Sequence, residues 1–297
     1  MKINIDAGHG SNTAGKRTPP MPKDIIINGK TICKNGEQYH EHYANVGVAN
    51  FLLSKLQRCG FNTMQTGFDD DNAYNDADTA LNARQKAIAA ANCDYSISIH
   101  FNAYGDGASF NSAKGIGIYI HNKYIGQSEK LAAIVLKHLS GGTKQTNRGV
   151  SKQALAMCNC NNLNVKAAIL VELAFMTNEN EAVTMMANPT FWKECAQEIC
   201  RGVCEYTGIK YIIENDMPKK TITPESTKSD IKWAQERLND VIPSWLPRLA
   251  VDGLYGAKTR LAVLTYWDQL GWGKDIADDG TRIGKATRKA LADKRRK

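Results

Sequence analysis

The candidate catalytic residues are histidines and glutamates that lie far apart in the chain. His9 follows a short alternating strand predicted at residues 2–6, His100 ends another predicted strand, and Glu172 lies within a third. Sites in open parallel α/β sheets form at the carboxyl ends of the strands, so these side chains are expected to meet in one cleft. Two histidines and one carboxylate are the ligands of a catalytic zinc ion that keeps an open position for water.

The residue types alone leave the third ligand open. Glu41 opens the helix that follows the first long loop, but His40 and His42 beside it are equally suitable by type. Adjacent helical residues point about 100° apart, so we expect one of the three to reach the metal. Glu172 is hard to explain as a structural residue, because the segment AILVELAF surrounds it with apolar side chains and burial of an unpaired carboxylate is costly. A carboxylate outside the ligand set can move a proton from water to a leaving amine.

Strand and helix patterns alternate along the first two thirds of the chain. This alternation predicts an α/β domain with a mostly parallel, twisted sheet flanked by helices. The segment 167–175 is almost wholly apolar, as a strand buried on both faces should be. The expected strands are residues 2–6, 62–65, 94–101, 115–121 and 167–175, and the expected helices are residues 43–58, 80–92, 129–139 and 191–206.

The last third of the chain differs in composition. Residues 1–209 hold 20 basic and 18 acidic side chains, whereas residues 210–297 hold 18 and 12, together with four of the five tryptophans. Residues 210–229 contain two prolines among lysine, threonine and serine, which predicts a linker. The expected domains are therefore a catalytic domain at 1–209 and a small helical domain at 230–297.

Five motifs occur in order along residues 1–208. They are IDAGHG at 5–10, E-x-x-x-N at 41–45, a run from NAR at 82–84 to SISIHFNA at 96–103, NRGV at 147–150, and VELAFMTN at 171–178. With these motifs the segment resembles the zinc-dependent N-acetylmuramoyl-L-alanine amidases of autolysins, sporulation enzymes and phage endolysins. The resemblance implies one zinc ion per catalytic domain, bound by His9, Glu41 and His100, and it implies that Glu172 is the catalytic carboxylate.

The same resemblance implies the reaction and its substrate. The expected activity is hydrolysis of the amide bond between the lactyl group of N-acetylmuramic acid and L-alanine in bacterial peptidoglycan. Asn102 and Arg148 lie in matching motifs and are candidates for substrate contact, while Arg84 fits a site role and a structural salt bridge equally well. The rival enzyme is a zinc peptidase that cuts within the stem peptide, and the rival from another class is a catalytically silent wall-binding protein.

The tail has a resemblance of its own. Residues 231–291 are similar to a helical peptidoglycan-binding module, on the motifs WAQ-x-x-L at 233–238 and VDGLYGAKTR at 251–260. A cationic tail would help the protein to approach anionic wall polymers. Its tryptophans are expected either to stack on sugars or to form the core. The terminal run KRRK is too short to predict a nucleic-acid partner.

The sequence also bears on where the protein acts. The N-terminus lacks the apolar region of a signal peptide, and no stretch approaches the ~18 apolar residues of a membrane helix. These features predict synthesis in the host cytoplasm, no membrane insertion, buried reduced cysteines, and action on the wall after release. A phage endolysin is the favoured role, and a host sporulation or autolysin amidase is the alternative. The oligomeric state stays open.

One insertion separates His9 from Glu41. Residues 25–32 place Asn28-Gly29 between apolar residues, which predicts a two-residue β-hairpin. A long loop in a compact domain is usually functional. Residues 15–38 are therefore expected to form one wall of the substrate groove, the alternative being a neutral insertion.

Overall fold

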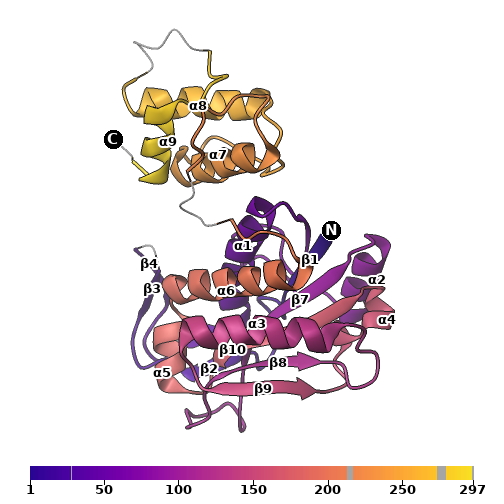
Figure 1. Cartoon of the computed structure of the whole chain (residues 1–297). Helices are drawn as coiled ribbons and strands as arrows, with labels where there is room; N and C mark the ends of the chain where they lie inside the picture. Colours follow the sequence, from indigo (N-terminus) through magenta and orange to yellow (C-terminus); the bar gives the residue numbers. More distant parts are fainter. Residues whose placement is uncertain (28, 213–216, 273–278, 296–297) are drawn as a thin grey trace. The chain divides into compact units, whose positions relative to one another are not determined.

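The computed structural model describes residues 1–27, 29–212, 217–272 and 279–295. The chain divides into two compact units (Figure 1). The first unit comprises Met1–Lys55 and Phe61–Tyr211, and the second comprises Leu56–Gly60 and Ile212–Lys297. Among the described residues, no helix combines the length and the apolar character needed to cross a membrane.

A six-stranded sheet forms the centre of the first unit. Its strand order is β6-β1-β7-β10-β8-β9, and all neighbours are parallel except β10 and β8, which are antiparallel. The predicted α/β class with a mostly parallel sheet is thus confirmed. In sheet order the strands are β6 (Asn62–Thr66), β1 (Lys2–Ala7), β7 (Tyr95–Asn102), β10 (Ala167–Phe175), β8 (Ile116–Ile120) and β9 (Asn147–Lys152).

Helices flank this sheet. Helix α3 packs on α6 and on the strands β8 to β10, while α2 packs on α4 (Figure 1). Local sequence fixes the ends of α6, because the Asn188 side chain accepts a hydrogen bond from the Thr190 amide and Gly208 ends the helix with a left-handed φ of 71°. The helices are α1 (Glu41–Arg58), α2 (Leu81–Ala90), α3 (Ser128–Thr143), α4 (Cys160–Leu163), α5 (Glu179–Glu181) and α6 (Pro189–Thr207), with single turns at Ala156–Cys158 and Ala182–Met186.

Strand β10 lies in the middle of the core. Every residue of Ala167–Phe175 is buried except Glu172, which keeps partial exposure. Such uniform burial is what a strand covered on both faces requires. Glu172 is therefore the one polar side chain on β10, and the one that is partly exposed.

The insertion before α1 folds into two small antiparallel pairs. Strand β2 (Arg17–Pro20) pairs with β5 (Gln38–His40), and β3 (Ile25–Ile27) pairs with β4 (Lys30–Cys33). The predicted hairpin is thus present in its two strands, although Asn28 itself lies outside the described residues. The β2–β5 pair at its base was not predicted from the sequence.

The second unit is helical in its described part. It contains α7 (Lys228–Val241), α8 (Ala257–Gln269) and α9 (Lys285–Ala292), with a bridge between Ile222 and Ile283. Trp233 and Trp267 are buried in its core, whereas Trp245 is 73% exposed. The prediction that the tryptophans form the core thus holds for Trp233 and Trp267 but not for Trp245. Part of the predicted linker, residues 213–216, and the last two residues of the basic run, 296–297, lie outside the described residues.

Candidate active site

The predicted site residues meet at one edge of the sheet. Strand β1 ends at Ala7, two residues before His9, and Glu41 is the first residue of α1. In the register of β7 and β10, His100 lies directly beside Glu172. These positions follow from the topology, because parallel strands β1, β7 and β10 bring their carboxyl ends to the same edge.

Both histidines contact the same carboxylate. His9 Nε2 lies 3.2 Å from Glu41 Oε2, and His100 Nδ1 lies 3.1 Å from Glu41 Oε1. The two imidazole rings meet edge to face with their centroids 4.8 Å apart. One potential ligand atom from each residue lies within 4.8 Å of the other two, so a single ion could reach all three.

The surroundings of Glu41 favour its ionised form. Its side chain is buried, which raises the pKa of the carboxyl, but the hydrogen bonds to His100 and His9 outweigh burial and lower that pKa well below its usual value. Oε1 also accepts hydrogen bonds from the Phe101 amide at 3.1 Å and from Asn45 Nδ2 at 3.4 Å. Burial lowers the pKa of His100, but the bond to Glu41 more than compensates and the pKa is raised.

Glu172 has the opposite surroundings. Its Oε2 is buried and has no hydrogen-bond partner among the described residues. Burial raises the pKa of Glu172 to about 7, with a smaller upward effect of the Glu41 charge and opposing effects of His100 and Lys16. A carboxyl group with a pKa near neutrality can both accept and return a proton.

The structure separates Glu41 from the histidines beside it. His40 Nδ1 lies 3.0 Å from the Ser11 carbonyl oxygen, and His40 is not part of the group formed by His9, Glu41 and His100. His42 contacts the Gly8 carbonyl oxygen through Nδ1 at 2.9 Å and the Asp76 carboxylate through Nε2 at 3.1 Å. Neither joins the group of potential ligand atoms. Asp76 was missed in the sequence, where it is one of several aspartates in an acidic loop.

The donor set fits a zinc ion. Two imidazoles and one carboxylate are typical ligands of catalytic zinc, and the histidine nitrogens already face the Glu41 oxygens. The unpartnered Glu172 oxygen supplies a second carboxylate at the same edge. Three ligands plus a separate proton acceptor are what hydrolysis by a metal-activated water needs.

The two predicted substrate-contacting residues lie at the end of β7 and near the start of β9. Asn102 ends β7, and its side-chain oxygen accepts a hydrogen bond from the Ala103 amide. Arg148 is exposed on β9, where its guanidinium lies 4.9 Å from the centre of the Phe175 ring and donates to the Lys114 carbonyl oxygen. The structure brings neither into contact with the histidine group.

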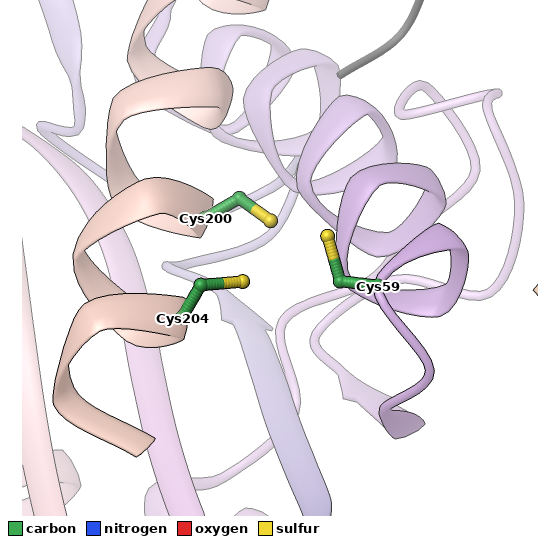
Figure 2. A group of neighbouring side chains, drawn as sticks. All are labelled: Cys59, Cys200 and Cys204. Atoms are coloured by element: carbon green, nitrogen blue, oxygen red, sulfur yellow. The ribbon is translucent and has the colours of Figure 1, made fainter. Parts of the chain in front are cut away.

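A second group of potential metal ligands consists of Cys59, Cys200 and Cys204 (Figure 2). Their side chains point toward one another, and the sulfur atoms lie within 4.8 Å of each other. Cys59 directly follows α1, whereas Glu41 opens it, so the two ends are roughly 27 Å apart. Buried thiols give a substrate no access, which leaves the histidine group as the candidate active site. The burial predicted for Cys158, Cys160, Cys195, Cys200 and Cys204 is confirmed, and the other three cysteines are buried as well.

The fold is a mostly parallel α/β sheet, and its strand ends hold potential metal ligands and the carboxyl of Glu172. These features define the class as an α/β protein whose site suits hydrolysis. The chain belongs to the N-acetylmuramoyl-L-alanine amidase family, whose model matches residues 3–205. No protein among the curated sequences matches the chain significantly.

Solved structures of amidases share the fold of the first unit. An N-acetylmuramoyl-L-alanine amidase from Clostridium difficile 630 is 24% identical, with a TM-score of 0.55, and the match covers 70% of this chain and 97% of that one. The catalytic domain of CwlV from Bacillus (Paenibacillus) polymyxa is 22% identical, with a TM-score of 0.54 and coverage of 71% and 99%. AmiC2 of Nostoc punctiforme is 20% identical, with a TM-score of 0.53 and coverage of 70% and 97%.

Proposed function

We propose that this chain is a zinc-dependent hydrolase that cleaves the amide bond between the lactyl group of N-acetylmuramic acid and L-alanine in peptidoglycan. The observation that carries the proposal is the convergence of His9, Glu41 and His100 at the sheet edge that also holds Glu172, in a chain of the amidase family. The same residues were singled out by the sequence motifs.

His9, Glu41 and His100 would hold the zinc ion. When bound, zinc would polarise the scissile carbonyl and lower the pKa of a water molecule to about 7. The hydrogen bonds that lower the pKa of Glu41 keep this side chain a carboxylate, the form a metal requires. One carboxylate and two neutral imidazoles balance only part of the charge of Zn²⁺, so a net positive charge would face the substrate.

Glu172 would move the proton. Its buried Oε2 has no competing hydrogen-bond partner among the described residues and would accept a proton from the attacking water. The same carboxyl would then donate that proton to the departing L-alanine nitrogen as the carbon–nitrogen bond breaks. The products are a lactyl carboxylate on the glycan and a free L-alanine amino terminus. A pKa of about 7 suits both transfers at neutral pH.

Asn102 and Arg148 would contact the peptidoglycan beyond the reacting bond. Arg148 lies on β9, one strand beyond Gly117, and Gly117 pairs with Glu172. Its guanidinium is exposed and could bind a carboxylate of the stem peptide by donating hydrogen bonds to it. Arg148→Ala is therefore expected to raise KM more than it lowers kcat.

The insertion before α1 would form a wall of the substrate groove. The Lys16 carbonyl oxygen accepts a hydrogen bond from the Glu41 amide, which ties the insertion to the ligand helix. Backbone hydrogen bonds of Met21 with Glu37 and Gly36 close the insertion at its base. Replacing residues 23–34 by a short turn should therefore keep the fold and change the stem-peptide preference. Unchanged turnover and preference would leave a neutral insertion.

The C-terminal segment 230–297 would hold the enzyme on the cell wall. Residues 210–297 have six more basic than acidic side chains, and Trp245 and Leu254 are largely exposed. The indole ring of Trp245 can stack on sugars, while the charge attracts an anionic wall and is screened by salt. Trp245→Ala in the full chain should reduce sedimentation with purified walls without changing turnover of soluble muropeptides.

Mass spectrometry of digested peptidoglycan tests the reaction. The proposal predicts glycan strands without peptide and stem peptides with free L-alanine amino termini. Fragments cut within the stem peptide would instead support the zinc peptidase. Wall binding without any cleavage, and without zinc in elemental analysis, would support a silent wall-binding protein.

The role as a phage endolysin made in the host cytoplasm stays a prediction. Expression in the host should leave cells intact until the membrane is permeabilised, and lysis should then follow within minutes. Lysis without permeabilisation would favour an exported autolysin, and expression confined to sporulating cells would favour a sporulation amidase.

A further inference from the structure

The backbone at His9 has an unusual conformation. His9 has a φ of 66°, in the left-handed region that non-glycine residues rarely adopt. Its neighbours have no room for side chains, since a Cβ at Gly8 would lie 2.1 Å from the His100 ring and a Cβ at Gly10 would lie 2.3 Å from the Asp78 amide. His9 reaches Glu41 from this turn, and hydrogen bonds from other elements hold the turn in place.

Arg84 binds the carbonyl oxygens on both sides of Gly8, whose own carbonyl oxygen contacts His42 and Asn45. It lies on α2, is almost fully buried, and binds two carbonyl oxygens of the turn with one guanidinium. All five N–H groups of this side chain have an acceptor at 2.5–3.0 Å. The acceptors are the carbonyl oxygens of Ala7, His9 and Thr79 and the carboxylates of Asp6 and Asp78.

Asp6 extends this network to the second histidine. Its Oδ2 accepts a hydrogen bond from Ser98 Oγ at 2.5 Å, so the Ser98 hydrogen is already used. Ser98 Oγ also lies 3.1 Å from His100 Nε2 and can only accept there. The Nε2 hydrogen of His100 is thus bound by Ser98, so Nδ1, which donates to Glu41 here, is the nitrogen that would bind a metal once it has lost its proton.

We propose that the buried Arg84–Asp6 pair is a positioning device shared by both histidine ligands. Arg84 fixes the backbone turn that presents His9, and Asp6 acts through Ser98 to hold His100 Nε2, which orients the ring so that Nδ1 faces Glu41. Neither residue touches the reacting atoms, so both act through the histidines. The inference rests on the proposed zinc site and adds to it the residues that determine how tightly zinc is held.

Zinc affinity is the measurement that separates positioning from simple stability. The full-length protein is titrated with zinc against a chelator of known affinity, and thermal unfolding is recorded with and without zinc. Arg84→Lys keeps the charge but cannot hold two carbonyl oxygens in one planar fork. Ser98→Ala removes the hydroxyl at little steric cost. Each variant should bind zinc ~10–100-fold more weakly, as loss of outer hydrogen bonds to metal ligands does.

Two matched variants provide controls. Ser96 is buried on the same strand and the same face as Ser98, but its hydroxyl contacts Asn4 instead of the histidines. Ile88 is buried on the same helix as Arg84 and belongs to a separate apolar cluster. Ser96→Ala and Ile88→Ala should lower the unfolding temperature while changing the zinc dissociation constant by less than ~2-fold.

The outcomes distinguish this inference from the proposed function. If Arg84→Lys and Ser98→Ala bind zinc as tightly as the controls do, the positioning role is wrong. If wild type binds zinc and these variants bind it weakly, the positioning role holds, even where wild type releases no L-alanine termini from peptidoglycan. That last result would contradict the proposed reaction alone.

Discussion

The regions around Glu41 and Glu172 differ, although both glutamates lie at the same sheet edge. Glu41 is surrounded by donors, namely two imidazoles, a backbone amide and an asparagine. Glu172 has a buried oxygen with no partner among the described residues. Hydrogen bonding lowers one pKa and burial raises the other, so identical side chains are prepared for opposite tasks. The difference shows that the surroundings of a carboxylate set its pKa here, through hydrogen-bond donors at Glu41 and through burial at Glu172.

The largest effect is expected from removing the charge of Glu41. Glu41→Gln keeps the shape but replaces the anion that both histidines contact. Zinc should be lost on dialysis, and activity should fall by more than ~10⁴-fold because both the metal and its water are lost. Elemental analysis and muropeptide release measure the two effects. Stoichiometric zinc in this variant would contradict the assignment of Glu41 as a ligand.

Glu172→Gln should affect only one of these two properties. The amide cannot accept a proton, so turnover should fall by ~10²–10⁴-fold, while zinc content stays at the wild-type level. Comparing the two variants side by side tests whether the two carboxylates have separate roles. Near-normal turnover by Glu172→Gln would show that another group takes the proton.

The pKa of Glu172 should be visible in the stability of metal-free protein. Its pKa is about 7 in the folded chain and near 4.5 when unfolded, so between these values the folded state binds more protons. Stability therefore falls as pH rises from about 4.5 through 7, by about 1–3 kcal/mol. Urea unfolding in the presence of a chelator should show this loss in wild type. The loss should be smaller in Glu172→Gln, where the raised pKa of His100 still contributes near pH 7, and an equal slope in both proteins would contradict the prediction.

The smallest effect is expected at Asn45. Its side-chain amide donates to Glu41 at 3.4 Å and to the Gly8 carbonyl oxygen at 3.1 Å. Asn45→Ala removes one hydrogen-bond donor from the surroundings of Glu41, which then resemble those of Glu172 more closely. Loss of these bonds should cost about 1 kcal/mol in urea unfolding. A loss of zinc-binding free energy larger than the loss of unfolding free energy would show that Asn45 also orients Glu41.

Much of the site could be predicted because its residues interrupt regular patterns. Glu172 is the one polar residue in an apolar strand, and His9 lies between glycines after a strand. The parallel topology then requires their convergence. The contacts around them could not be predicted, because they depend on backbone carbonyls. His42 contacts the Gly8 carbonyl and Arg84 contacts those of Ala7 and His9, and such acceptors leave no trace in residue types.

The fold shows the same division. The alternation of strands and helices predicted the sheet and its mostly parallel order. The β2–β5 pair and the edge strand β9 were missed, and for β9 the reason is that it is almost wholly exposed and so lacks a hydrophobic pattern. In the tail, the sequence could not predict which tryptophans are buried and which are exposed. Burial of Trp233 and Trp267 depends on how the helices pack.

The crowding around Gly8 and Gly10 has a consequence for mutational tolerance. Both positions admit no side chain without displacing the His100 ring or a neighbouring backbone. Random mutagenesis should therefore recover almost no active variants across residues 8–10, whereas exposed positions such as Ile26 on the β3–β4 hairpin should accept many replacements. Engineering of this chain therefore has its freedom at exposed positions such as those of the hairpin, and the three-residue turn is best left untouched.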